Sequence, residues 1–295
     1  MRTVYLGTSE FAAGVLRRLA DSPHRPLLVL TRPDRRAGRG RRLSAPPVAL
    51  AARELGIELD QPESVNGQAA GERIAAARPE CVCVCAFGAL IKEPLLSDFP
   101  MLNVHPSLLP RWRGAAPVER AIMAGDERTG VSIMRVTAGL DSGPVCLQDD
   151  AAIEPRDNYA TLAGRLQALG GELLVRALDA PPPFAEQDDA LATYAEKIGP
   201  EDRVLDPARP AVELERVVRA LTPHIGAHVE LPGGDRLRVH EARALPDAAV
   251  AEGEVSLDGT RPVLGCVSGA LELLVVQPPG GRPMSAEDYL RGHRR

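Results

Sequence analysis

The chain has 295 residues, 44% of them apolar and 25% charged, which is the composition of an ordinary globular protein with room for two domains. Its formal charge of −5 argues against a protein that coats nucleic acid indiscriminately. No segment has the roughly 20 consecutive apolar residues that cross a bilayer, and the N-terminus lacks a signal-peptide core. We therefore expect a cytoplasmic protein with no membrane partner.

Strand and helix patterns alternate through the first 180 residues. Apolar runs predict strands at residues 3–7, 27–30, 81–86, 102–104 and 131–136. Helical spacing predicts helices from residue 11 onward and over 48–55, 68–77, 118–124 and 159–178. This alternation predicts an open, mostly parallel, Rossmann-like α/β sheet, whose ligands bind at the carboxyl ends of the strands.

Three cysteines alternate along one predicted strand. Cys81, Cys83 and Cys85 would share one face of it, and a zinc site is one interpretation. However, the usual two-residue gap between ligands is missing and no second Cys/His pair follows at a matching distance. We expect buried core thiols and no metal.

A change of composition near residue 180 separates two domains. Residues 1–180 form the predicted catalytic domain, and the proline-rich, irregular residues 181–203 form a linker. Residues 204–295 contain one helix and five short strands, at 227–231, 236–239, 253–257, 263–267 and 271–276. This pattern predicts a small OB-like β-barrel.

The segment LNVHPSLLPRWRGAAP at residues 102–117 carries the densest set of reactive side chains. Asn103 and His105 lie two residues apart at a strand end, so both side chains point to the same side and can converge on one atom. An isolated histidine of this kind is more often structural. Asp141, in GLDSGP just after another predicted strand, supplies a carboxylate, although Asp is also a common turn residue.

These motifs resemble the signature of the folate-dependent formyltransferases. The resemblance implies that Asn103, His105 and Asp141 form the catalytic group. It implies folate contacts from two further segments, AFGALI and SLLP. The implied folate-binding residues are Phe87, Gly88, Leu90, Ile91, Ser107, Leu108, Leu109 and Pro110.

The resemblance extends from YLGTSEFA to LELLVVQPPGGRPMSAEDYLRG and is strongest to the methionyl-tRNA formyltransferase family. It implies transfer of a formyl group from 10-formyltetrahydrofolate to the amino group of methionyl initiator tRNA in translation initiation. In such a transfer the formyl carbon becomes tetrahedral and its oxygen negative. Asn103 and a ring N–H of His105 can donate to that oxygen, and Asp141 can assist the proton transfer. We expect folate and initiator tRNA as partners of a monomer, with the OB-like domain of residues 204–295 as a second surface that contacts the tRNA.

A second segment, TRPDRRAGRGRR at residues 31–42, carries six arginines. Such a run is often only a solvated loop, but its glycines suit a loop that orders on a phosphate backbone. In the family the equivalent loop enters the tRNA acceptor end. The predicted RNA contacts are Arg35, Arg36, Arg39, Arg41 and Arg42, with Arg39 central.

Two other functions stay open at this point. One is formyl transfer to a small amine, such as glycinamide ribonucleotide or an amino sugar, and the other is a catalytically silent tRNA-binding module. A dinucleotide-binding oxidoreductase lacks support because the GxGxxG spacing is absent. The chain departs from the family pattern at Ser9, Ala49 and Pro207. The last two departures concern predicted RNA contacts, not the catalytic group.

Overall fold

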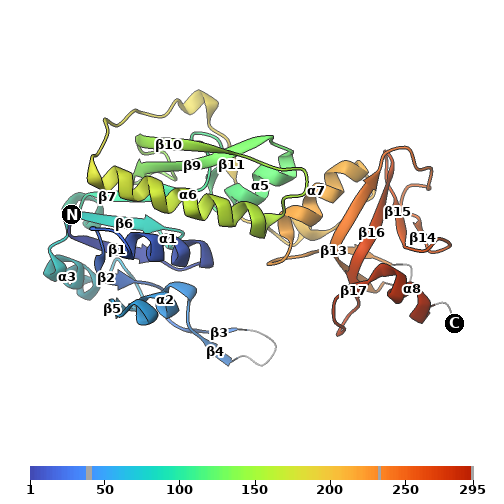
Figure 1. The fold of residues 1–295 in the computed structure, drawn as a ribbon, viewed down its shortest axis with the longest axis horizontal. Coiled ribbons are helices and arrows are strands. Elements are labelled where there is room, and N and C mark those ends of the chain that lie inside the picture. Colours follow the sequence, from blue (N-terminus) through green and yellow to red (C-terminus); the bar gives the residue numbers. More distant parts are fainter. Residues whose placement is uncertain (38–41, 232–233, 294–295) are drawn as a thin grey trace. The chain divides into compact units, whose positions relative to one another are not determined.

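The computed structural model describes residues 1–37, 42–231 and 234–293 (Figure 1). The chain divides into two compact units whose segments interleave. Unit 1 contains residues 1–114, 129–152 and 163–194, and unit 2 contains residues 115–128, 153–162 and 195–295. Within the described residues, no helix is long and apolar enough to cross a membrane.

Unit 1 is built on a seven-stranded sheet in the order β10-β9-β7-β6-β1-β2-β5. Five neighbouring strands, from β5 to β7, run parallel, and β9 is antiparallel to β7. The predicted mostly parallel, Rossmann-like sheet is therefore confirmed. The strands are β1 (Thr3–Gly7), β2 (Pro26–Leu30), β5 (Glu58–Asp60), β6 (Cys81–Cys85), β7 (Met101–His105), β9 (Arg128–Arg135) and β10 (Val145–Ala152).

The chain winds outward from the centre of this sheet in two directions. From β1 it proceeds through β2 to β5 on one side, and from β6 through β7 on the other. The carboxyl ends of β1 and β6 therefore flank the point where the strand order reverses. In open α/β sheets this is where the ligand crevice lies.

Both faces of the central strands are buried, which explains their continuous apolar sequences. On one face Val82 and Val84 of β6 join a core cluster with Ile74 of α3 (Gln68–Ala77) and Leu95 of α4 (Leu95–Asp98). The three cysteines of β6 alternate with these valines and are buried on the opposite face as free thiols. The prediction of core thiols is confirmed.

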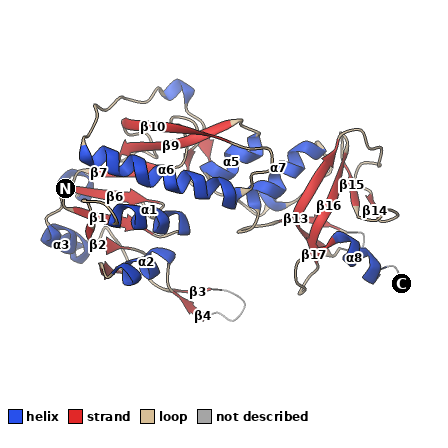
Figure 2. Ribbon diagram, in the orientation of Figure 1, coloured by secondary structure: helices blue, strands red, loops and turns tan. Residues whose placement is uncertain are grey.

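Helices α1 (Glu10–Ala20) and α6 (Tyr159–Asp179) lie side by side over the cysteine-bearing face (Figure 2). Ser9, one of the departures from the family pattern, is the N-cap of α1 and accepts a hydrogen bond from the Ala12 amide. Helix α2 (Pro47–Leu55) packs beside α1, and its Ala49 is fully buried. A lysine at this buried position would need a partner for its charge.

The arginine-rich segment is more ordered than we expected. Its described parts form a two-stranded antiparallel hairpin of β3 (Arg35–Ala37) and β4 (Arg42–Ser44), where we had expected a loop. The predicted contacts Arg39 and Arg41 lie outside the described residues.

Unit 2 contains an antiparallel sheet whose hydrogen-bonded order runs β12-β13-β16-β15-β14, with β17 paired to β16. Helix α7 (Ala211–Leu221) packs on β13 and beside α5 (Pro117–Ala124), and α8 (Ala286–His293) packs on β16. The expected second β domain is thus present as an antiparallel sheet. Its strands are β12 (Ala227–Glu230), β13 (Arg236–Leu245), β14 (Val255–Ser256), β15 (Val263–Gly265), β16 (Ala270–Gln277) and β17 (Met284–Ser285).

Two glycines of α6 give a matched test of its packing. A Cβ at Gly170 would lie 2.8 Å from Val104 of β7, whereas a Cβ at Gly164 would meet nothing within 4 Å. We predict that Gly170→Ala lowers the free energy of unfolding by about 1–3 kcal/mol through overpacking. Gly164→Ala should raise it by up to about 1 kcal/mol, because alanine is the better helix former.

Urea denaturation of both variants beside the parent chain measures this difference. Equal changes in the two variants would contradict the close packing of α6 on β7.

Candidate functional site

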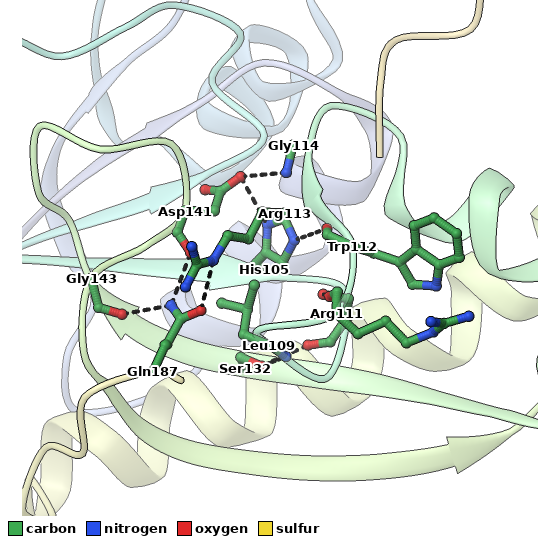
Figure 3. A network of polar contacts seen from close by, with 11 residues as sticks. His105, Leu109, Arg111, Trp112, Arg113, Gly114, Ser132, Asp141, Gly143 and Gln187 are labelled. Carbon is green, nitrogen blue, oxygen red and sulfur yellow. Dashed lines mark hydrogen bonds and ion pairs between the residues drawn. The ribbon is translucent and has the colours of Figure 1, made fainter. Parts of the chain in front are cut away.

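His105 ends strand β7 and is 4% exposed. Its Nε2 lies 2.9 Å from the Trp112 carbonyl oxygen, and its Nδ1 lies 3.6 Å from Oδ2 of Asp141 (Figure 3). The ring is thus held between a neutral acceptor and a carboxylate, as Figure 3 shows.

The Trp112 carbonyl determines which nitrogen of His105 carries hydrogen. A carbonyl oxygen has no hydrogen to donate, so Nε2 must be the N–H donor of this bond. In the neutral ring Nδ1 then has a free lone pair on the side of Asp141. We expected a ring N–H of His105 to donate to the reacting oxygen. Because the Nε2 hydrogen is already engaged, only the protonated ring has such a donor, at Nδ1.

Asp141 is held by a backbone amide. The Gly114 N–H donates to Oδ2 of Asp141 over 2.9 Å, and the Asp141 side chain is 18% exposed. Within the described residues, the Asn103 side-chain amide makes no hydrogen bond. Asn103 lies on β7 two residues before His105, so both side chains leave the same side of the strand. The Asn103 amide is therefore available to a ligand on that side.

Both residues that contact His105 have strained backbones. Among the described non-glycine residues, positive φ angles occur at Arg78 (47°), Ala86 (40°), Trp112 (63°) and Asp141 (45°). A non-glycine residue in this region is strained unless its surroundings hold it there. Ala86 begins the AFGALI segment, so three of the four strained residues lie in the predicted catalytic and folate segments.

Gln187 joins the two loops that carry these strained residues. Its Nε2 donates to the carbonyl oxygens of Asp141 (2.9 Å) and Gly143 (2.7 Å), while its Oε1 accepts from Nε of Arg113 (3.0 Å). Arg113 is 3% exposed and also pairs with Asp189. Gln187 thus fixes the distance between the loop of Asp141 and the loop of Trp112, as the dashed contacts in Figure 3 show.

Thr193 holds the loop that carries Trp112 and Arg113. Its hydroxyl accepts from the Trp112 amide over 2.9 Å, and its carbonyl accepts from the Arg113 amide over 2.9 Å. These contacts accompany the short pairing of β8 (Arg113–Gly114) with β11 (Tyr194–Ala195). The sequence did not predict a role for Gln187 or Thr193, because both lie in the irregular stretch that we expected to be a linker. No local pattern marks them there.

The AFGALI segment follows β6 at the reversal point of the sheet. The Thr8 hydroxyl after β1 donates to the Phe87 carbonyl over 2.7 Å, so the two loops that flank this point are joined. Phe87 and Ile91 are buried in the core cluster, whereas Gly88 is exposed and Leu90 is 59% exposed. The segment therefore presents the Leu90 side chain to a ligand.

The SLLP segment is held from inside. Ser107 is fully buried, and its hydroxyl donates to the Arg111 carbonyl over 2.6 Å. Leu109 donates its amide to the Ser132 hydroxyl and, with Pro110 and Gln187, lines a pocket of 290 Å³. Leu108 is partly buried beside them. Ser107 thus shapes the loop, while Leu109 and Pro110 are accessible from this pocket.

Family models match nearly the whole chain. The formyl transferase model matches residues 1–178, and the model of the formyl transferase C-terminal domain matches residues 197–294. The chain belongs to the formyl transferase family.

Its curated relatives place it among the methionyl-tRNA formyltransferases of that family. The protein of this name from Methylococcus capsulatus is 42% identical over 99% of this chain and 97% of its own length. The one from Pseudomonas paraeruginosa is 44% identical over 100% of this chain and 96% of its own. These matches include residues 195–295 of unit 2, which the first family model does not cover.

A solved structure shares the fold. HypX from Aquifex aeolicus in complex with tetrahydrofolic acid superposes with a TM-score of 0.68 at 16% identity. The match covers 98% of this chain but only 47% of HypX, so the chain spans about half of that protein.

The bridging role of Gln187 can be tested in this family member. Gln187→Leu keeps the size of the side chain but removes its three hydrogen bonds, so the Asp141 loop loses its fixed place beside His105. We predict a fall in kcat/KM for formyl transfer of about 100-fold, the order expected from a displacement of about 1 Å.

The exposed residue Glu172 of α6, which lies outside the pocket that Gln187 lines, supplies the control. Glu172→Gln should leave kcat/KM unchanged, and both variants should keep the parent's thermal unfolding midpoint within a few degrees. Full activity of Gln187→Leu would show that the Asp141 loop needs no such support.

Proposed function

We propose that the chain transfers a formyl group from 10-formyltetrahydrofolate to the amino group of methionyl initiator tRNA. The placement of Asn103, His105 and Asp141 together at the carboxyl end of β7 supports this most strongly. The chain that carries them is 42% identical to a methionyl-tRNA formyltransferase over nearly its full length. The transfer forms a bond between the methionyl nitrogen and the formyl carbon and breaks the bond to N10. The attacking nitrogen loses a proton and N10 gains one.

The residues at the reversal point suit a folate. A pterin ring is flat and carries hydrogen-bonding groups on its rim, so it needs both apolar contact and backbone donors and acceptors. Leu90 is 59% exposed after β6, and Leu140, immediately before Asp141, is 58% exposed. We assign the pterin to the segment of Phe87, Gly88, Leu90 and Ile91, in which Gly88 and Leu90 are exposed and the buried Phe87 and Ile91 hold the segment in place. We assign the adjoining folate contact to the SLLP segment.

His105 and Asp141 handle the proton. The free lone pair of Nδ1 accepts the proton that the attacking amine loses, and the resulting imidazolium is stabilised by the carboxylate 3.6 Å away. The Nε2 hydrogen cannot take part, because it remains bonded to the Trp112 carbonyl. A single ring atom therefore receives and returns the proton.

Asn103 stabilises the negative oxygen. Its side-chain amide has no partner among the described residues, so it can donate to the formyl oxygen without first breaking another bond. The protonated Nδ1 of His105 is a second donor from the same side of β7. Loss of one such donor slows a reaction of this kind about 10²- to 10³-fold.

The acceptor RNA is assigned to the arginine hairpin. Arg35 and Arg36 of β3 are exposed, and with Arg39, Arg41 and Arg42 they form a run of positive charge suited to phosphates. In the assay described next, Arg39→Ala should raise the KM for tRNA and leave the KM for folate unchanged. An equal loss of folate affinity would overturn this assignment.

The test is a parallel assay of acceptors. The purified chain receives 10-formyltetrahydrofolate with methionyl initiator tRNA, glycinamide ribonucleotide or an amino sugar. We predict formylation of the charged tRNA alone, and a fall in kcat of about 10²- to 10⁴-fold in His105→Ala, because proton transfer is lost.

Formylation of a small amine would keep the chemistry of the site and refute the RNA substrate. Binding of tRNA without any transfer would instead identify a silent binding module.

A further inference from the structure

Tyr194 is the one exposed aromatic side chain of the described residues. The chain contains one Trp, four Tyr and four Phe. Among them only Tyr194 is exposed, at 58%, while the others are buried or partly buried. Within the described part of the chain its hydroxyl makes no hydrogen bond. The ring and its hydroxyl are therefore accessible to a ligand.

The backbone that carries this ring is fixed. Tyr194 lies in β11, which pairs with β8. The carbonyl of Thr193 accepts from the Arg113 amide over 2.9 Å. The carbonyl of Ala195, which is fully buried, accepts from the Ala115 amide over 2.8 Å. A tyrosine on a fixed backbone offers a large contact surface and loses little conformational freedom when it binds.

The partner of Tyr194 in this pairing holds a residue of the proposed catalytic group. Because the two bonds lie one residue to either side, Gly114 and Tyr194 are opposite each other. The Gly114 N–H donates to Oδ2 of Asp141 over 2.9 Å, and paired strands lie about 4.8 Å apart, so the Tyr194 backbone lies within about 10 Å of that carboxylate. The exposed ring is thus at the margin of the site to which we assign the proton transfer.

The covalent structure of the acceptor sets where its last base lies. Four bonds of about 1.5 Å join the amine of a methionyl ester to the ribose, and the base is attached further along the same sugar. The methionine side chain instead begins on the carbon that bears the amine. With the amine at Nδ1 of His105, beside Asp141, the terminal base can reach Tyr194, whereas the methionine side chain stays closer to the reacting atoms.

We propose that Tyr194 stacks on the base of the 3′-terminal nucleotide of the acceptor RNA and so holds the aminoacylated end beside His105. This inference rests on the proposed function, which supplies an RNA acceptor. Proteins bind unpaired RNA ends largely through aromatic rings, because every base offers a flat face for stacking. The exposed ring, the fixed backbone and the position beside Gly114 together give Tyr194 this role.

Kinetics with methionyl initiator tRNA test the role of the ring. Tyr194→Ala should raise the KM for tRNA about 5- to 150-fold, the factor that corresponds to ~1–3 kcal/mol of stacking on one base, and leave the KM for folate unchanged. Tyr194→Phe keeps the ring and should recover the parent KM. Leu27→Ala, which removes a half-exposed side chain at the amino end of β2, should change the KM for tRNA less than twofold.

Binding of uncharged tRNA to the full chain identifies the partner of the ring. Filter binding compares intact tRNA with tRNA whose 3′-terminal nucleotide lacks its base but keeps its ribose and phosphate. Removal of the base should weaken binding to the parent about as much as Tyr194→Ala does. It should have no further effect on Tyr194→Ala, because the two changes remove one and the same interaction.

An unchanged KM for tRNA in Tyr194→Ala would overturn the proposal, and failure of Tyr194→Phe to recover the KM would mean that the hydroxyl binds instead of the ring. Losses that add in the binding comparison would show that ring and base do not touch. Weaker binding of methionyl-tRNA but not of uncharged tRNA to Tyr194→Ala would place the methionyl group on the ring instead. The binding comparison needs no formyl transfer, so it holds even if the parent formylates no tRNA and the proposed function fails.

Discussion

The bond from Nε2 of His105 to the Trp112 carbonyl is the contact on which the proposed chemistry depends. It places the hydrogen of the neutral ring on Nε2 and leaves the lone pair of Nδ1 facing Asp141. A histidine with the opposite tautomer would point an N–H at the carboxylate and could not accept a proton there. The site therefore needs the Trp112 carbonyl in one orientation, and Trp112 occupies this place with a strained backbone of positive φ (63°).

That orientation is maintained by a segment far along the chain. Thr193 bonds to the amide of Trp112, and Gln187 joins Arg113 to the backbone of the Asp141 loop. Strained backbones persist only where several contacts hold them. Residues 187–193 supply these contacts, so the end of unit 1 supports the proposed active site although it contributes no reacting group.

The sequence predicted the sheet well where burial was complete. Both faces of β6 are covered, and its continuous apolar sequence, CVCVC, therefore predicts a buried strand directly. β10 was missed because its sequence, VCLQDDAA, is half exposed, is interrupted by three polar residues and shows no clear period. The proposed catalytic group could be named from the sequence because Asn103 and His105 are close in sequence and Asp141 lies in a recognisable motif.

The supporting contacts could not be predicted in the same way. Gln187 acts on Asp141 from 46 positions away, and its role arises from how two loops meet. The placement of Tyr194 is similar, since it lies beside Gly114 only through the pairing of β11 with β8. Side chains that act through tertiary packing leave no periodic signal in the sequence.

The most direct test of this account is the ring nitrogen spectrum of His105. The chain is labelled with ¹⁵N-histidine, the His105 signals are assigned by their absence in His105→Gln, and the pH is raised through the titration of the ring. The account predicts that the departing proton leaves Nδ1 and that Nε2 keeps its hydrogen. Loss of the hydrogen from Nε2 instead would contradict both the tautomer and the proton transfer assigned to this site.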